Sequence, residues 1–211
     1  MNTLIITGGQ ISKTFLKNYL NENKYDIIIV ADKGLESIDA LNIEPNYIIG
    51  DFDSVNQNIL EKYKNRNINR LLPEKDFTDT EAALEIAINK NSKDVTIIGA
   101  TGTRLDHVLA NVHILKIALD KGINARIIDC NNEIILIKDK IEIEKNNKYK
   151  YISLIPLTTE VKGLTLKGFK YEVQEYTLQI GTSLGVSNEQ IDDKAIITLV
   201  EGILIVIKSK D

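Results

Sequence analysis

The chain has 211 residues and a formal net charge of −4, because 30 Asp and Glu outnumber 26 Lys and Arg. The lysines are scattered and form no basic stripe, so we do not expect a nucleic-acid partner. A single cysteine, Cys130, excludes an internal disulfide framework and suits a reducing cytoplasm. The N-terminus lacks the basic start of a signal peptide, and no apolar run approaches the roughly 20 residues that cross a bilayer. We therefore expect a cytoplasmic protein with no membrane partner.

Up to about residue 130 the chain alternates short β-branched runs with segments of helical period. Such runs, ended by Gly or Asp, are typical of buried strands, and the segments between them are expected to be helices. The expected strands lie within residues 1–9 and at 27–31, 47–50, 95–99 and 125–129. Ile11, Phe15 and Tyr19 lie four residues apart, which predicts a helix after the first strand. Further helices are expected over 34–42, 78–90 and 105–121. This alternation predicts an α/β domain with a mainly parallel sheet flanked by helices.

After residue 132 the helical period disappears and strand-like runs follow one another. They lie at 134–137, 141–143, 149–156, 164–166, 172–180, 195–200 and 203–208. Several short strands at this spacing predict an all-β sandwich. We therefore expect two domains, residues 1–131 and residues 132–211.

Acidic side chains follow several of the expected strands. Asp32 follows the run at 27–31, Asp51 and Asp53 follow 47–50, and Asp106 comes a few residues after 95–99. The loops after parallel strands leave one edge of the sheet, where open α/β folds bind their ligands. Two carboxylates about 4 Å apart repel by roughly 4 kcal/mol at an effective dielectric near 20, whereas a helix cap contributes only about 1 kcal/mol. We therefore expect divalent cations and a polyphosphate among these acids.

Asp51 and Asp53 form an Asp-x-Asp pair at the end of an expected strand. In an extended segment, residues two apart point the same way, so we expect both carboxylates to reach one site. Oxygen ligands at this spacing suit magnesium, which is usually completed by water and substrate phosphates. The structural alternative is a solvated loop with a turn-forming aspartate.

A further acidic cluster, residues 76–81, opens an expected helix. Thr78 and Glu81 fit a capping box, in which Ser or Thr is followed three residues later by Glu. Asp76 and Asp79 suit a helix start, where acids favour the positive end of the dipole. Taken alone they are better explained as capping acids, but beside the Asp-x-Asp pair a role as metal ligands becomes equally reasonable.

Residues 99–106 form a Gly-rich turn between an expected strand and an expected helix. Such a turn commonly holds phosphate with its backbone N–H groups, here those near Thr101 and Gly102. Arg104 adds a bidentate phosphate donor. A plain connecting turn would explain the glycines but not an Arg and Asp106 at the start of the helix.

Two other patterns do not support the motifs that they suggest. Residues 7–14 have Thr and Ser where a P-loop needs its two glycines, so we reject that motif. His107 and His113 are expected on a helix face, and with the lone Cys130 they support neither a zinc site nor a histidine-activated nucleophile.

Together these segments resemble the thiamin pyrophosphokinase (thiamin diphosphokinase) family over nearly the whole chain. The segments that carry the resemblance are 31–34, 45–54, 75–81, 99–107 and 183–188, in the family's order. The family is an ATP-dependent, magnesium-requiring homodimer with an α/β catalytic domain and a β-sandwich that helps to bind thiamin. The resemblance therefore implies transfer of the pyrophosphoryl group of ATP to the thiamin hydroxyl, releasing AMP.

The resemblance also implies roles for individual residues. Asp51, Asp53 and Asp79 would hold magnesium, and either Asp51 or Asp106 would accept the proton of the thiamin hydroxyl. The residues expected at ATP are Asp32, Lys75, Asp76, Thr78, Thr101, Gly102 and Arg104. Ser187 and Asn188 would contact thiamin from the second domain.

Two other functions remain open from the sequence alone. Residues 51–55 also fit the Asp-x-Asp-x-Thr/Val motif of haloacid-dehalogenase phosphatases, in which Asp51 would be a covalent nucleophile. Against this, Gly50 breaks the preceding apolar run and the motif lies far from the N-terminus. The second alternative is a non-catalytic nucleotide-binding protein, which would bind ATP without releasing AMP.

Overall fold

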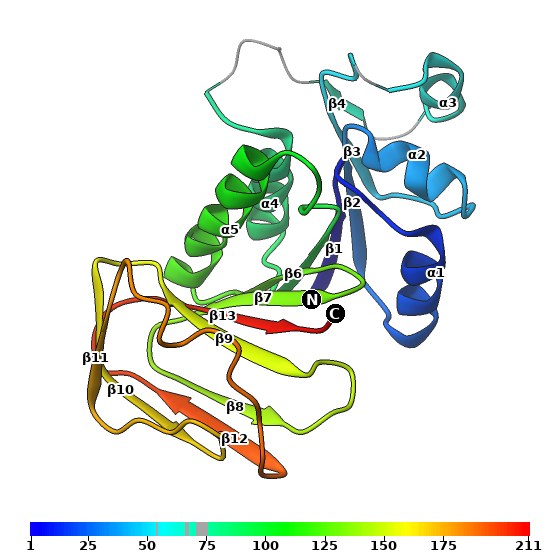
Figure 1. Ribbon diagram of the computed structural model, residues 1–211. Coiled ribbons are helices and arrows are strands. Elements are labelled where there is room, and N and C mark those ends of the chain that lie inside the picture. The colour runs from blue at the N-terminus through cyan, green and yellow to red at the C-terminus, as the bar shows by residue number, and fades with distance from the viewer. Residues whose placement is uncertain (54, 66–67, 71–75) are drawn as a thin grey trace. The chain divides into compact units, whose positions relative to one another are not determined.

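A computed structural model describes residues 1–53, 55–65, 68–70 and 76–211 of the chain. These residues form two compact units, Met1–Cys130 and Asn131–Asp211. Figure 1 labels their helices and strands. None of the helices in the described ranges has the length and apolar character that a membrane crossing requires.

The first unit is built on parallel strands. They are β1 (Asn2–Ile6), β2 (Ile27–Ala31), β3 (Tyr47–Gly50), β4 (Ile68–Arg70), β5 (Asp94–Ile98) and β6 (Asn124–Ile128). Their spatial order is β4-β3-β2-β1-β5-β6, and each neighbouring pair is parallel. Strands β2, β3 and β4 follow one another on one side of β1, and β5 and β6 then lie on its other side. This reversal is a topological switch point, where open α/β sheets bind their ligands.

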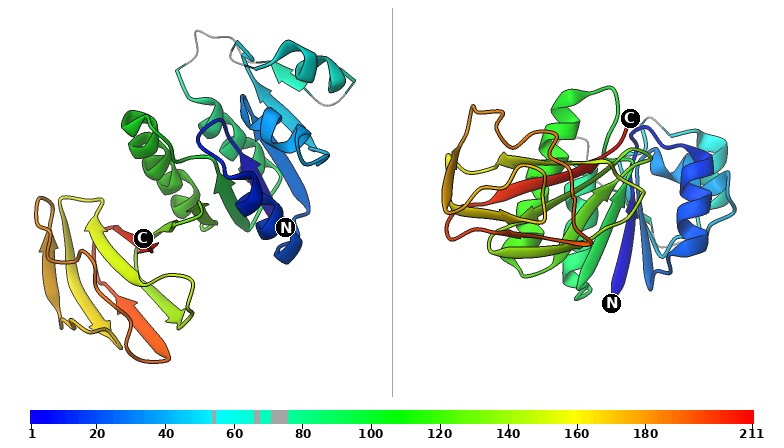
Figure 2. Two further views of the ribbon diagram at one scale, coloured as in Figure 1. Left: turned by 45° about the vertical axis from the view of Figure 1, so that its right-hand side comes forward. Right: turned by 60° about the horizontal axis from the view of Figure 1, so that its bottom comes forward.

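Helices cover both faces of this sheet, as the expected α/β pattern requires. They are α1 (Lys13–Glu22), α2 (Gly34–Asp39), α3 (Gln57–Lys62), α4 (Asp79–Asn89) and α5 (Leu105–Asp120). Figures 1 and 2 show α4 and α5 on one face of the strands, and α1 and α2 on the other. The sequence analysis missed the short α3 and β4, and it placed the end of α2 three residues too late.

The loops that follow β1 and β5 are bonded to each other through their backbones. The N–H of Gly9 donates to the carbonyl of Gly99 at 2.8 Å, and that of Gln10 donates to Thr101 at 2.9 Å. A Cβ on Gly9 would lie 2.2 Å from the Gly99 oxygen and 2.4 Å from the Thr101 oxygen. Only glycine therefore fits at position 9, because any side chain would push the two loops apart.

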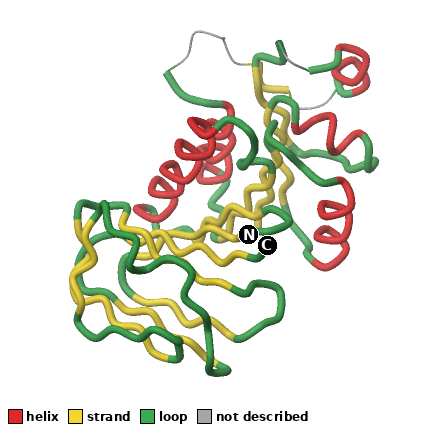
Figure 3. Tube along the Cα trace, viewed as in Figure 1, coloured by secondary structure: helices red, strands yellow, loops and turns green. Residues whose placement is uncertain are grey.

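The second unit consists of antiparallel strands in two layers. They are β7 (Asn132–Ile137), β8 (Lys140–Glu144), β9 (Tyr151–Pro156), β10 (Glu160–Lys167), β11 (Tyr176–Gln179), β12 (Lys194–Thr198) and β13 (Leu204–Ser209). One layer has the order β7-β13-β9 and the other β11-β10-β12-β8. In Figure 3 this unit is drawn entirely as strands and loops, without helices. Between the layers lies a core that includes Phe169, Val161, Ala195 and Leu204, so the expected β-sandwich is confirmed.

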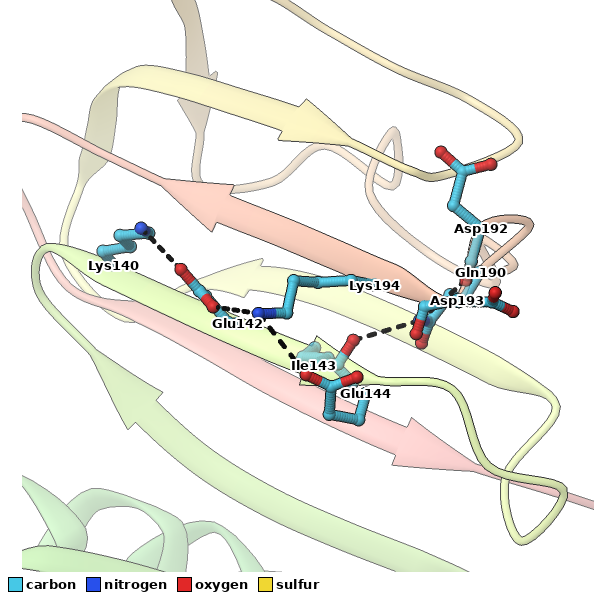
Figure 4. Close-up of polar contacts among 8 residues, drawn as sticks. All are labelled: Lys140, Glu142, Ile143, Glu144, Gln190, Asp192, Asp193 and Lys194. Carbon is cyan, nitrogen blue, oxygen red and sulfur yellow. Dashed lines mark hydrogen bonds and ion pairs between the residues drawn. The ribbon is translucent and has the colours of Figure 1, made fainter.

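Charged side chains of β8, an edge strand, form a chain of ion pairs with Lys194 of the neighbouring β12 (Figure 4). Glu142 lies 2.7 Å from the ammonium groups of both Lys140 and Lys194, and Lys194 also lies 3.4 Å from Glu144. Hydrogen bonds from Lys140 and Lys194 lower the pKa of Glu142 to about 2. Charged side chains on an edge strand discourage pairing with another chain, so this ladder is explained by solubility.

We predict that Gly9→Ala destabilises the first unit, because the new Cβ overlaps the backbone of the neighbouring loop. Overpacking of this kind costs roughly 1–3 kcal/mol. The matched control is Gly102→Ala, whose Cβ would meet no atom closer than 3.3 Å. Thermal unfolding should show a clear loss of stability for the first variant and little for the second. Equal unfolding midpoints would mean that the two loops are not held at this contact.

Candidate active site

A cavity of about 630 Å³ lies at the carboxyl ends of β1 and β5, at the switch point of the first unit. Its walls come from the loops after β1, β2 and β5 and from the first turns of α4 and α5. The lining residues are Thr7, Gly8, Gly9, Gln10, Asp32, Lys33, Thr78, Asp79, Thr80, Gly99, Ala100, Thr101, Gly102, Thr103, Arg104, His107, Val108 and Asn111. The volume falls within the range of small-molecule sites, about 300–1,000 Å³.

Buried hydrogen bonds fix the walls of this cavity. The hydroxyl groups of Thr7 and Thr80 lie 2.9 Å apart and connect the loop after β1 to the first turn of α4. The buried side-chain amide of Asn111 donates to the carbonyl of Ala100 at 2.8 Å. The hydroxyl of Thr101 donates to Asp129 at 2.9 Å. These bonds fix the loop after β1 against α4, and the loop after β5 against α5 and Asp129.

Two helices begin at the cavity. The Thr78 hydroxyl caps α4 by accepting from the N–H of Glu81 at 3.2 Å, as the capping box predicted. Arg104 is the N-cap residue of α5 and makes no side-chain cap. The unpaired N–H groups and the dipole of a helix start favour negative charge. The cavity is therefore suited to phosphate groups.

The structure brings about half of the expected site residues together. Six of them line the cavity: Asp32, Thr78, Asp79, Thr101, Gly102 and Arg104. Four more described residues of the first unit lie outside the lining: Asp51, Asp53, Asp76 and Asp106. Lys75 lies outside the described residues. Among the described residues, no three Asp, Glu, His or Cys side chains are gathered as a ready metal site.

The segment that carries Asp51 and Asp53 is a turn, so the extended geometry expected from the sequence is wrong. Phe52 has a positive φ of 64° and its ring is buried in the core beside β3. The N–H of Asp53 donates to the Asp51 carboxylate at 3.1 Å. Burying Phe52 forces the turn, and the turn uses one carboxylate oxygen of Asp51 to hold the backbone.

Arg104 and Asp106 form an exposed ion pair at the start of α5. The guanidinium donates to the carboxylate at 2.6 and 3.3 Å. These hydrogen bonds lower the pKa of the Asp106 carboxyl to about 2. While it is paired in this way, Asp106 is a weak proton acceptor. The N–H groups of Arg104 are bonded to this carboxylate, so a phosphate could bind them only by displacing Asp106.

In the second unit, the two residues expected at thiamin have different surroundings. Asn188 is buried, and its amide donates to the Tyr171 carbonyl at 2.8 Å and accepts from the N–H groups of Tyr171 and Glu189. Ser187 is exposed, with a positive φ of 59°, and its N–H donates to the Ser153 hydroxyl at 2.9 Å. The Asn188 side chain therefore holds the loop, and the Ser187 side chain faces outward.

Sequence reasoning missed several lining residues. The loop after β1 was considered only as a P-loop and set aside, although two glycines directly after a first strand were a usable signal. His107 is exposed on the face of its helix, as expected, and it also lines the cavity from the first turn of α5, which the sequence analysis did not predict. No pattern in the sequence identified Thr80 or Asn111, because their roles depend on contacts that form only in the fold.

Comparisons with known proteins agree with this architecture. The family model described as "Thiamin pyrophosphokinase, catalytic domain" matches residues 16–127, and "Thiamin pyrophosphokinase, vitamin B1 binding domain" matches residues 138–204. The thiamine pyrophosphokinase of Bacillus subtilis is 34% identical over the full length of both chains.

Solved structures give the same result. A thiamine pyrophosphokinase structure from Bacillus subtilis superposes with a TM-score of 0.92 at 32% identity, covering all of both chains. A structure from Geobacillus thermodenitrificans superposes with a TM-score of 0.88 at 29% identity, covering 100% of this chain and 98% of that one. The chain therefore belongs to the thiamin pyrophosphokinase family.

Proposed function

We propose that the chain transfers the pyrophosphoryl group of ATP to the hydroxyl of thiamin, giving thiamin diphosphate and AMP. The observation that carries this proposal is the cavity at the β1–β5 switch point, where two helices begin. Family membership makes the chain an ATP:thiamin diphosphotransferase. The alternative of a haloacid-dehalogenase phosphatase is not favoured, because the relatives at full length are thiamin pyrophosphokinases.

The phosphates of ATP would lie against the loops after β1 and β5. Glycines in both loops, including Gly8 and Gly102, let the backbone approach a ligand closely. Arg104 would exchange its contact with Asp106 for a phosphate oxygen, and such pairs are often bidentate. We keep Lys75, Asp76 and Thr78 as proposed contributors to ATP binding.

Magnesium is part of the proposal, with Asp51, Asp53 and Asp79 as its candidate ligands. The donor set fits, because Mg²⁺ prefers oxygen ligands and usually binds one or two carboxylates together with water and substrate phosphates. When bound, the ion would neutralise negative charge on the phosphates.

The thiamin hydroxyl is a poor nucleophile and needs a proton acceptor. Asp51 and Asp106 are the two proposed acceptors; the pairing with Arg104 lowers the pKa of Asp106, so Asp106 could take this role only after Arg104 has moved to a phosphate. Ser187 is the proposed thiamin contact in the β-sandwich, within the segment that matches the vitamin B1 binding domain. Asn188 would act indirectly, by holding the loop that presents Ser187.

Two further proposals rest on the resemblance and on composition. We propose a homodimer with C2 symmetry, in which each site occurs twice. We also propose a cytoplasmic location, which suits the single, exposed and unbridged Cys130. Sedimentation in solution would contradict the first proposal if it gave only the mass of one chain.

The direct test of function is an incubation with ATP, magnesium and thiamin, followed by separation of the products. We expect thiamin diphosphate and AMP in equal amounts, and neither without thiamin. Release of inorganic phosphate without an acceptor would favour a phosphatase. Binding of ATP with no AMP would favour a non-catalytic protein.

We predict that Asp53→Asn and Asp79→Asn each abolish turnover and leave the fold intact. Removing one carboxylate removes a proposed ligand and lowers the repulsion among the acids, so thermal stability should be equal or higher. Asp192→Asn, an exposed substitution of equal charge in the second unit, is the matched control and should keep full activity. Substantial turnover of either site variant at saturating magnesium would exclude its ligand role.

We predict that Ser187→Ala raises the thiamin KM several-fold and changes the ATP KM little, since a lost hydrogen bond is worth about 0.5–1.5 kcal/mol. Thr182→Ala, in the same exposed loop, is the control and should change neither value. Asn188→Ala should instead lower stability, by about 0.5–1.5 kcal/mol for each hydrogen bond lost, because the Asn188 side chain bonds the backbone of Tyr171 and of Glu189. Equal effects of Ser187→Ala on both KM values would show that this loop does not serve thiamin.

A further inference from the structure

The second unit contains a cavity of its own, with a volume of about 340 Å³. It is formed by the segment that connects β8 to β9, by the end of β13 and by two residues that precede β12. The lining residues are Ile143, Lys145, Asn146, Asn147, Lys148, Tyr149, Lys150, Ile152, Glu189, Gln190, Lys208 and Lys210. None of them lines the cavity of the first unit.

Strand pairing gathers these lysines from distant parts of the chain. β13 pairs with β9 so that Lys208 lies opposite Ile152 and Ser209 opposite Tyr151. The N–H of Lys150 donates to the Ser209 carbonyl at 2.9 Å and closes the junction. Five lysines thus line one small cavity with a single glutamate, in a chain whose net charge is −4. Like charges that are gathered in this way repel one another unless an anion offsets them.

The acids around this cavity are already engaged with particular lysines. Glu189 pairs with Lys170, which lies outside the lining, at 2.8 Å. Lys208 pairs with Glu133 at 2.7 Å, and both side chains are largely buried. The hydrogen bond with the Tyr151 side chain raises the pKa of Lys150, and the charges of Glu189 and Asp211 add smaller contributions in the same direction. The cavity therefore keeps an excess of positive charge.

Aromatic rings support several of the ammonium groups. Lys148 and Lys208 lie 4.9 and 5.7 Å from the centre of the Tyr149 ring. Lys150 lies 4.8 Å from the centre of the Tyr151 ring. A cation over a ring gains about 0.5–1 kcal/mol at exposed sites, which restrains otherwise mobile side chains. The apolar residues Ile143 and Ile152 complete the lining.

We propose that this cavity is a second anion site, which binds a small molecule carrying a di- or triphosphate group. Lysine ammonium groups bind phosphate as point charges, and several of them together match a ligand with several negative charges. The volume is at the lower end of the range for small-molecule sites, about 300–1,000 Å³. A bounded cavity of this size favours a small phosphorylated ligand over a nucleic-acid strand, which needs an extended basic surface.

The test is calorimetric titration of the full chain with inorganic pyrophosphate, without magnesium. The site variant is Lys148→Ala/Lys150→Ala, and the control is Lys138→Ala/Lys167→Ala, which removes the same charge from exposed positions of the same unit. We expect at least a tenfold loss of affinity for the site variant and none for the control. Equal binding by both would mean that these lysines serve only solubility and would overturn the proposal.

Pyrophosphate can also bind in the first unit, so Arg104→Ala serves as a second arm. Binding that persists in Arg104→Ala and disappears on adding the two lysine substitutions supports the proposal. Pyrophosphate binding that is lost with Arg104→Ala alone places the whole signal in the first unit and contradicts it. In the Arg104→Ala chain, competition by ADP or by thiamin diphosphate identifies the organic part of the ligand, and failure of both to compete indicates free pyrophosphate.

Discussion

The candidate site depends on one contact, the backbone pairing of the loops after β1 and β5. Two hydrogen bonds, from Gly9 to Gly99 and from Gln10 to Thr101, hold the loops together where the strand order reverses. A Cβ at Gly9 would overlap both carbonyl oxygens, so this contact requires glycine. Because the loops meet here, the first turns of α4 and α5 open onto one cavity, and groups that recognise phosphate converge.

Most of the architecture could be predicted from the spacing of apolar residues, because in long regular segments the burial of these residues decides between helix and strand. The strands that flank the cavity lie in apolar runs of the sequence, and each strand of the second unit overlaps one of the strand-like runs expected there. α3 and β4 were missed because they are short and the few apolar residues of their segments form no regular stripe or run, whereas the equally short α2 lies in a segment with Leu35, Ile38 and Leu41 three residues apart. The turn at Phe52 was missed because tertiary burial of the ring overrides the extended conformation that follows from the strand before it.

Residue types alone predicted the site less completely than the fold. Acids and glycines after strands located the correct edge of the sheet, and Asp32, Asp79 and Arg104 do line the cavity. Hydrogen-bond partners, however, are set only in the folded chain. Asn188 reads as a polar ligand residue in the sequence but is used to hold backbone, and lysines that look scattered in the sequence meet around one cavity.

The central claim is that the nucleotide binds at the β1–β5 switch point. Hydrogen–deuterium exchange, with and without a non-hydrolysable ATP analogue and magnesium, tests it directly because it reports each backbone segment separately. The account predicts slower exchange in residues 7–10, 99–104 and the first turn of α4, which form the cavity walls. Slower exchange confined to residues 131–211, with none in those segments, would contradict it.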